Sequence, residues 1–147
     1  MSPLAKFKTK GELGEIRKEL WFGRNRKLKS IKMYKEMYAD LPLRFQKKID
    51  NDLQYLIKSQ IPGLRKVFLF GSCARGEVKS TSDVDLLILT ETRITDRLLA
   101  ADVRWTLDEA IDGVRTDVTY THEGAELSSR VFKKEVDRDK KLILEVV

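Results

Sequence analysis

The stretch LFGSCARGEVKSTSDVDLLIL, residues 69–89, joins two apolar runs through a glycine-containing turn and places two aspartates at the start of the second run. Short apolar runs bounded by glycine and polar residues are typical of buried strands. Side chains alternate between the two faces of a strand, so Asp83 and Asp85 lie on the same face. Two like charges on one face are costly unless a cation compensates them. The stretch therefore predicts a strand, a tight turn and a second strand that carries a pair of carboxylates.

These carboxylates are chemically suited to a divalent cation. Mg²⁺ prefers carboxylate and phosphate oxygens, and Asp117, in the segment VRTDVTY, supplies a third carboxylate from a separate predicted strand. If that strand pairs beside the second one, Asp83, Asp85 and Asp117 converge on one site. Taken alone, the aspartate pair can be a turn followed by a cap, and Asp117 can be a surface residue. The joint spacing favours the metal site.

The turn between the two strands carries residues suited to phosphate. Glycine lets the backbone turn sharply and approach a ligand closely, and Gly71 is followed directly by Ser72, whose hydroxyl can donate a hydrogen bond. Arg75 lies about one helical turn further on, within reach of a phosphate. A Gly-Ser pair alone is commonly only a turn. Together with the nearby carboxylates, it supplies what phosphoryl or nucleotidyl transfer requires, namely positioned phosphates and neutralised charge.

This arrangement resembles the signature of the DNA polymerase β-like nucleotidyltransferase superfamily: Gly71-Ser72, ten residues, then the DVD of residues 83–85. The fuller form, LFGSCARGEVKSTSDVDLLI, is most similar to the minimal nucleotidyltransferases, the MNT type. The resemblance covers about residues 64–147 and is most specific over residues 68–89. It implies an α/β (α+β) fold with a small mixed sheet flanked by helices.

The resemblance also implies roles for individual residues. Gly71 and Ser72 would hold the triphosphate of the incoming nucleotide, and Asp83 and Asp85 would ligate Mg²⁺. Asp117 would be the third carboxylate, which helps to activate the acceptor hydroxyl or binds a second Mg²⁺. Arg75 stays a predicted phosphate contact.

The family further implies a partner. Many minimal nucleotidyltransferases are antitoxins of HEPN/MNT toxin–antitoxin pairs, and such antitoxins transfer AMP from ATP to a tyrosine of a HEPN ribonuclease toxin (AMPylation). We therefore expect a Mg²⁺-dependent nucleotidyltransferase with ATP as donor and a HEPN-type toxin as acceptor. The motif itself does not select the nucleotide, because donor pockets choose bases through contacts that no short motif reveals.

The rest of the chain predicts a helical entrance to this core. We expect a basic helical N-terminal region over residues 1–63, packed on or extending from a nucleotidyltransferase core over residues 64–147. Apolar residues recur at helical spacing in its three expected helices. The expected helices cover 12–22, 26–38, the stretch from Pro42 to Pro62, 92–111 and 124–136, and residues 73–78 are expected as a short helix or a turn. The expected strands cover 66–70, 84–89 and 115–121, and residues 142–147 are expected as a last strand or an ordered tail.

Composition restricts the cellular setting. The 147 residues, 41% hydrophobic and 35% charged, suit one globular domain. No apolar run approaches the roughly 20 residues that span a bilayer, and residues 1–10 lack the apolar core of a signal peptide. Cys73 is the single cysteine, which excludes an internal disulfide and is interpreted as a packing residue. We therefore expect a cytoplasmic protein without a membrane partner.

Two alternative functions stay open, and the first of them follows from charge. The net charge is +6, with the excess of Lys and Arg in residues 1–66. Such a region can attract nucleic acid, so the acceptor can instead be an RNA 3′ end, or less simply a small molecule; a lysine-rich solvated helix surface explains it equally well. The other alternative is a non-catalytic antitoxin that only binds its toxin.

His122, the single histidine, has no predicted partner and is interpreted as incidental.

Overall fold

The computed structural model describes residues 8–10, 15–18, 29–125 and 130–147. Within them lies one mixed sheet in the order β1-β2-β3-β7-β4-β5-β6. Strands β5 and β6 are parallel, and the other neighbours are antiparallel. The elements are β1 (Lys8–Lys10), β2 (Glu15–Lys18), β3 (Lys29–Met33), the 3₁₀ helix η3 (Lys35–Tyr38), α1 (Leu43–Ser59), β4 (Leu64–Phe70), α2 (Gly71–Arg75), β5 (Val84–Thr90), α3 (Arg97–Asp108), β6 (Thr116–His122), α4 (Arg130–Asp139) and β7 (Lys141–Val146).

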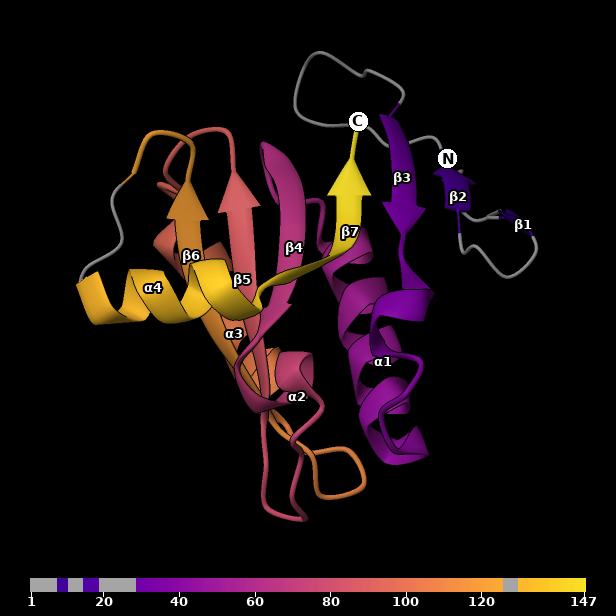
Figure 1. Cartoon of the computed structure of the whole chain (residues 1–147). Coiled ribbons are helices and arrows are strands. Elements are labelled where there is room, and N and C mark those ends of the chain that lie inside the picture. Colours follow the sequence, from indigo (N-terminus) through magenta and orange to yellow (C-terminus); the bar gives the residue numbers. More distant parts are fainter. Residues whose placement is uncertain (1–7, 11–14, 19–28, 126–129) are drawn as a thin grey trace.

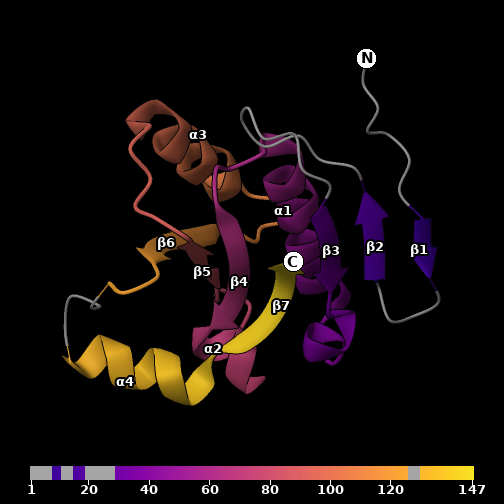
Figure 2. The same cartoon turned by 90° about the horizontal axis from the view of Figure 1, so that it is seen from above.

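Helices cover both faces of the sheet. Figure 1 shows α4 crossing in front of β5 and β6 with α1 and α3 behind the strands, and the view from above in Figure 2 shows the same layers. Strand alternation explains this arrangement. On β5, Leu86 and Ile88 enter the large core cluster with α1 and α3, whereas Leu87 packs with Phe70 and Val136 of α4. The predicted small mixed sheet flanked by helices is confirmed.

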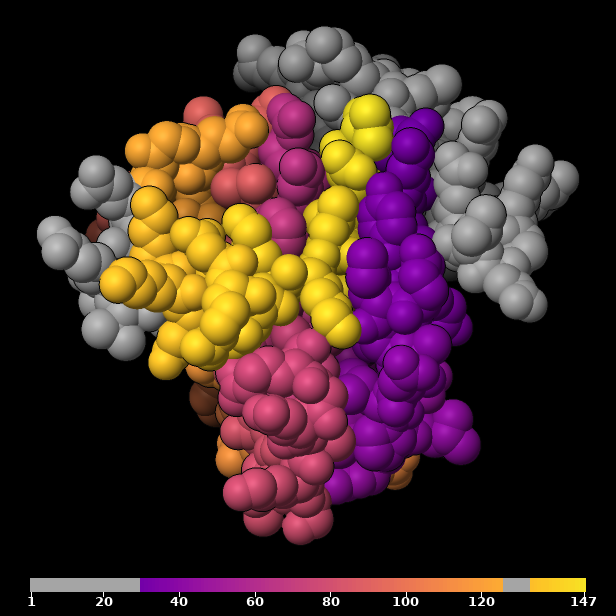
Figure 3. All heavy atoms as spheres, viewed as in Figure 1, coloured from indigo at the N-terminus to yellow at the C-terminus, as the bar shows by residue number. Residues whose placement is uncertain are grey.

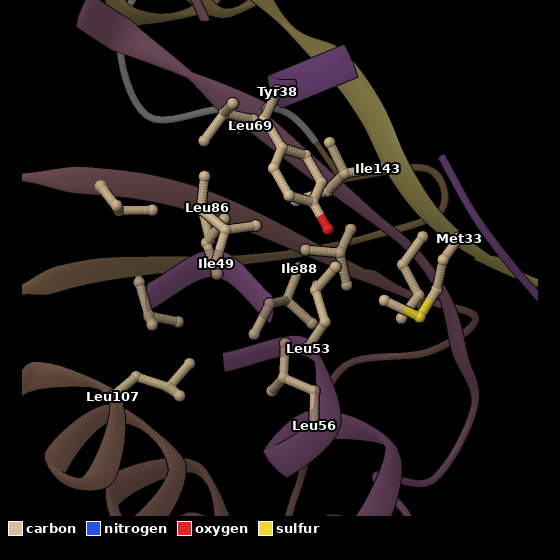
Figure 4. Close-up of a cluster of buried hydrophobic side chains, with 14 of the residues drawn as sticks. Met33, Tyr38, Ile49, Leu53, Leu56, Leu69, Leu86, Ile88, Leu107 and Ile143 are labelled. Carbon is tan, nitrogen blue, oxygen red and sulfur yellow. The ribbon is translucent and has the colours of Figure 1, made fainter. Parts of the chain in front are cut away.

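The main core lies between the sheet and α1. Ile49, Leu53 and Leu56 follow one stripe of this helix and are fully buried. Figure 4 shows Ile49 and Leu53 beside Leu86 and Ile88 of β5. Burying an aliphatic side chain of this size contributes about 1.5–3 kcal/mol, so this stripe fixes α1 firmly against the sheet.

The helical prediction for residues before α1 is wrong for two of the described segments. Residues 15–18 and 29–33 form β2 and β3 where helices over 12–22 and 26–38 are predicted. In β3, Ile31 and Met33 are buried and pair with β7 through Val146 and Leu144. Their two-residue period suits a strand, and the partner strand lies more than a hundred residues away, so local spacing does not reveal it. The end of the second predicted helix, in contrast, is helical, because residues 35–38 form the 3₁₀ helix η3. Residues 12–14, 19–22 and 26–28 of the two predicted helices lie outside the described residues.

The third predicted helix and the later elements agree better with the structure. Helix α1 occupies the stretch from Pro42 to Pro62, and β4, β5, β6 and β7 match the predicted strands to within two residues at each end. The helix predicted over 92–111 begins later, because Asp96 accepts a hydrogen bond from the Leu99 amide (3.0 Å) and caps α3. The helix predicted over 124–136 corresponds to α4, and residues 126–129 lie outside the described residues.

Residues on both sides of position 63 share one core. Ile31 and Phe45 belong to the same buried cluster as Val67 and Ile143. The division into an N-terminal region and a core at residue 63 stays a prediction. Among the described helices, none combines the length and the apolar character needed to cross a bilayer.

Candidate active site

The turn after β4 brings backbone directly onto a carboxylate. Gly71 has φ +73°, in the left-handed region that favours glycine. A Cβ atom built on Gly71 would lie 2.5 Å from Oδ2 of Asp85. The turn therefore requires glycine for its conformation and again for its contact with Asp85. Ser72 follows at the start of α2 and is half-buried.

The sheet register brings the three predicted carboxylates to one end of the sheet. Asp85 on β5 is the register partner of Asp117 on the parallel strand β6. Register partners on neighbouring strands point to the same face. Asp83 immediately precedes β5 and alternates with Val84, so it shares that face. This is the end at which β4 turns into α2, with Phe70 opposite Asp85.

Burial and the two neighbouring carboxylates disfavour the charged form of Asp85. Burial, then the charge of Asp117, then the charge of Asp83 raise the pKa of Asp85 to about 6, while Arg75 acts in the opposite direction. A pKa raised by like charges marks a site that a cation would stabilise. The predicted convergence of Asp83, Asp85 and Asp117 is thus present in the structure, whereas their roles stay predictions.

Arg75 lies at the site but is engaged by other carboxylates. Its Nε donates to Glu77 (2.8 Å) and its Nη1 to Asp139 at the end of α4 (2.7 Å). Figure 3 shows the yellow atoms of α4 meeting the pink atoms that follow β4. Arg75 thus joins α2 to α4 beside Asp85. The contact of Arg75 with a phosphate stays a prediction. To make it, the guanidinium would have to use its remaining N–H groups or give up a hydrogen bond to Glu77 or Asp139.

Sequence reasoning missed Asp139. It lies in the charged run KKEVDRDKK, whose composition predicts a solvated helix end, yet its side chain is only 4% exposed. Hydrogen bonds first from Arg138 and then from Arg75 hold the pKa of Asp139 at about 2. The nearby buried Val136 is the single apolar residue in that run, too weak a signal to indicate which neighbouring charge turns inward.

Cys73 and His122, the single cysteine and the single histidine, lie in different surroundings. Cys73 is buried, and its Sγ donates to the backbone oxygen of Asp83 (3.4 Å). Burial, then the charges of Asp85 and Asp83, raise the pKa of its thiol to about 12, which keeps it un-ionised and unreactive at neutral pH. His122 ends β6 as the register partner of Thr90, at the opposite end of the strand from Asp117.

The donor set fits Mg²⁺ in a site shared with substrate. Asp83, Asp85 and Asp117 offer hard carboxylate oxygens, the ligands that this ion prefers. Among the described residues, no group of three or more His, Cys, Asp or Glu side chains is already arranged to hold a metal ion. Mg²⁺ is usually bound through one or two carboxylates together with substrate phosphates rather than in an all-protein cage. The like-charged cluster beside Gly71 therefore fits an ion that arrives with a nucleotide.

The charge on Asp85 predicts a pH-dependent stability. Its folded-state pKa is raised from 3.8 to about 6, so between these values the folded state binds the extra proton. Its contribution to the free energy of unfolding therefore falls as pH rises through this window. Asp117→Asn removes one cause of the raised pKa. We expect this variant to gain stability relative to wild type, and to gain more at pH 7 than at pH 5.

Denaturant unfolding of both proteins at the two pH values, with EDTA present, measures this difference. Comparing wild type with Asp117→Asn at each pH cancels the titration of groups that the substitution leaves alone. An equal stability difference at both pH values would show that Asp117 does not repel Asp85.

Several solved structures are similar to part of this chain. A complex described as a toxin–antitoxin with AMP-PNP is similar at 26% identity and a TM-score of 0.49 (63% of this chain, 70% of that chain). A proposed nucleotidyltransferase from Sulfolobus solfataricus is similar at 25% and 0.47 (68% and 79%). The tri-AMPylated Shewanella oneidensis HEPN toxin in complex with MNT antitoxin is similar at 22% and 0.43 (65% and 70%).

A comparison with curated proteins found no match. The family model described as nucleotidyltransferase domain matches residues 45–145, which include most of α1, the Gly-Ser turn and all three carboxylates. The chain therefore belongs to the nucleotidyltransferase domain family.

Proposed function

We propose that this chain is a Mg²⁺-dependent nucleotidyltransferase that moves a nucleoside monophosphate, AMP from ATP, onto a hydroxyl of a partner protein. The register pairing of Asp85 with Asp117, against the backbone of Gly71, carries this proposal. It joins a set of hard oxygen ligands to a turn that can approach a phosphate closely. The nucleotidyltransferase family supplies the reaction class.

Each residue then has a defined part in the reaction. Asp83 and Asp85 would hold Mg²⁺, which would neutralise charge on the phosphates. Gly71 and Ser72 hold the triphosphate in line with the acceptor. Asp117 accepts the proton of the acceptor hydroxyl or contributes to a second metal site. The acceptor oxygen forms a bond to the α-phosphorus. The bond between the α-phosphorus and the oxygen that bridges to the β-phosphate breaks, and pyrophosphate leaves.

We propose a HEPN-type toxin as the acceptor, in the cytoplasm. The support is the motif LFGSCARGEVKSTSDVDLLI, which is most similar to minimal nucleotidyltransferases of HEPN/MNT pairs. A single cysteine suits a reducing compartment. An RNA 3′ end is the second candidate acceptor, favoured by the excess of Lys and Arg in residues 1–66.

The test follows the label from the nucleotide. The purified chain is incubated with Mg²⁺, each of the four α-³²P-labelled nucleoside triphosphates, and either the protein encoded by the neighbouring gene or an RNA. We expect label from ATP on the protein, with an equal amount of pyrophosphate released. Label on RNA, with binding that weakens steeply as salt rises, would favour the second candidate. Tight binding of the partner without label or pyrophosphate would favour an antitoxin that acts by contact alone.

A further inference from the structure

A buried ion pair lies on the far side of the sheet from the carboxylates. Lys48 and Asp52, one turn apart on α1, have side chains that are 1% and 0% exposed. Lys48 Nζ donates to Asp52 Oδ1 (2.7 Å) and to the backbone oxygen of Leu107 in α3 (2.8 Å). The lysine thus fixes one oxygen of the Asp52 carboxylate and ties α1 to the last turns of α3.

The other oxygen of Asp52 reaches the strand that carries Asp117. It accepts a hydrogen bond from the hydroxyl of Thr116, which is 1% exposed and is the first residue of β6. Alternation along the strand directs Thr116 toward α1 and Asp117 to the opposite face, beside Asp85. Asp52 therefore holds the residue directly before the third carboxylate.

The position of β6 in the sheet explains why it needs such an anchor. It is the last strand in the sheet order and, among the described strands, pairs only with β5. An edge strand has a neighbouring strand on one side alone, so contacts with the helices behind the sheet, such as the hydrogen bond from the Tyr120 hydroxyl to Ala100 O (2.7 Å), also help to fix its position. A buried ion pair is a weak source of net stability compared with apolar packing of the same volume. It is well suited, in contrast, to fixing one geometry, because its hydrogen bonds are directional.

We propose that Asp52, oriented by Lys48, is a positioning residue of the active site: it holds Thr116 so that Asp117 lies beside Asp85. This inference rests on the proposed metal role of Asp117. It differs from a purely structural role because it links the Thr116 hydroxyl to metal binding at the opposite face of the sheet. Residues that orient metal ligands from behind typically change metal affinity or activity about 10–100-fold when they are replaced.

The test replaces Thr116 with valine, which keeps the shape and removes the hydroxyl. Binding of Mn²⁺, alone and with the non-hydrolysable α,β-methylene analogue of ATP, is measured by electron paramagnetic resonance. We expect Thr116→Val to weaken Mn²⁺ binding about tenfold. Thr116→Ser, which restores the hydroxyl, is expected to recover most of the loss.

Thr90→Val is the matched control. Thr90 is equally buried on neighbouring β5, its hydroxyl donates to Thr92 O (2.7 Å), and it lies at the end of the sheet away from the carboxylates. We expect this control to cost similar stability and to leave Mn²⁺ affinity unchanged. Equal Mn²⁺ affinities for Thr116→Val and Thr90→Val would overturn the proposal.

A second comparison separates positioning from general loosening of the fold. In an Asp117→Asn background, Thr116→Val should have little further effect on Mn²⁺ binding, because the ligand it positions is already gone. Full additivity of the two losses would overturn the proposal. If Thr116→Val does not fold, Asp52→Asn takes its place in both comparisons under the same two criteria. Mn²⁺ binding is measured without any nucleotidyl transfer taking place. If the wild-type protein binds Mn²⁺ but transfers no nucleotide, the proposed reaction is wrong, and the positioning role can still be tested by the same binding measurements.

Discussion

Asp85→Asn is expected to reduce nucleotidyl transfer at least about 10³-fold while leaving the metal-free protein no less stable than wild type at neutral pH. The loss follows because an amide is a poor ligand for Mg²⁺ compared with a carboxylate. A catalytic metal supplies several kcal/mol of transition-state stabilisation, and each 1.36 kcal/mol corresponds to tenfold in rate. The retained stability follows because ionised Asp85 is disfavoured by burial and by its two acidic neighbours.

Two measurements on the same variant check both halves of this expectation. Transfer is followed by label from ATP, and stability by the thermal midpoint with and without Mg²⁺ and nucleotide. Ligand binding raises the midpoint of a protein that binds it only when folded, so wild type should gain stability and Asp85→Asn should not. Asp102→Asn, at an exposed aspartate of α3, is the control and should behave like wild type.

One pattern would remove Asp85 from the metal site. If Asp85→Asn keeps full transfer activity and still gains thermal stability from Mg²⁺ and nucleotide, the ligands lie elsewhere. If the thermal midpoint of Asp85→Asn in EDTA is lower than that of wild type, the carboxylate of Asp85 stabilises the metal-free fold. That result would contradict the expectation that burial and the two acidic neighbours disfavour ionised Asp85.

The active-site strands could be read from sequence because their signal is local. The alternation of Asp83 with Val84, and the apolar run that follows, fix the face of the carboxylates without knowledge of the rest of the fold. The approach of Asp117 needed one further assumption, that its strand lies beside β5, and the parallel register satisfies it.

The features that sequence reasoning missed depend on distant partners. Residues 29–33 form a strand because β7, at the other end of the chain, pairs with them, and no local pattern separates that outcome from a helix. Lys48 and Asp52 stand four residues apart on α1, the spacing of an ordinary surface ion pair. Only the packing of α1 against α3 and β6 turns that pair inward.

Gly71→Ala is expected to reduce transfer by about 10²-fold or more, through its effect on Asp85 rather than through general loss of stability. Alanine in the left-handed conformation costs about 1–2 kcal/mol, which a folded domain of ordinary stability tolerates. The larger effect is steric, because the new Cβ would lie 2.5 Å from Asp85 Oδ2 and the carboxylate would have to move. A displacement of about 1 Å at a catalytic group can cost about 10²-fold in rate.

Gly76→Ala separates the two contributions. Gly76 has almost the same φ, +74°, but a Cβ there meets nothing within 4 Å. Both variants therefore carry the same backbone strain, and only Gly71→Ala presses on the carboxylate. We expect similar thermal midpoints for the two variants, with activity and Mn²⁺ binding lost in Gly71→Ala alone. Equal activity in both variants would mean that the contact between the turn and Asp85 is not needed, and the turn would then serve the site only through its backbone conformation.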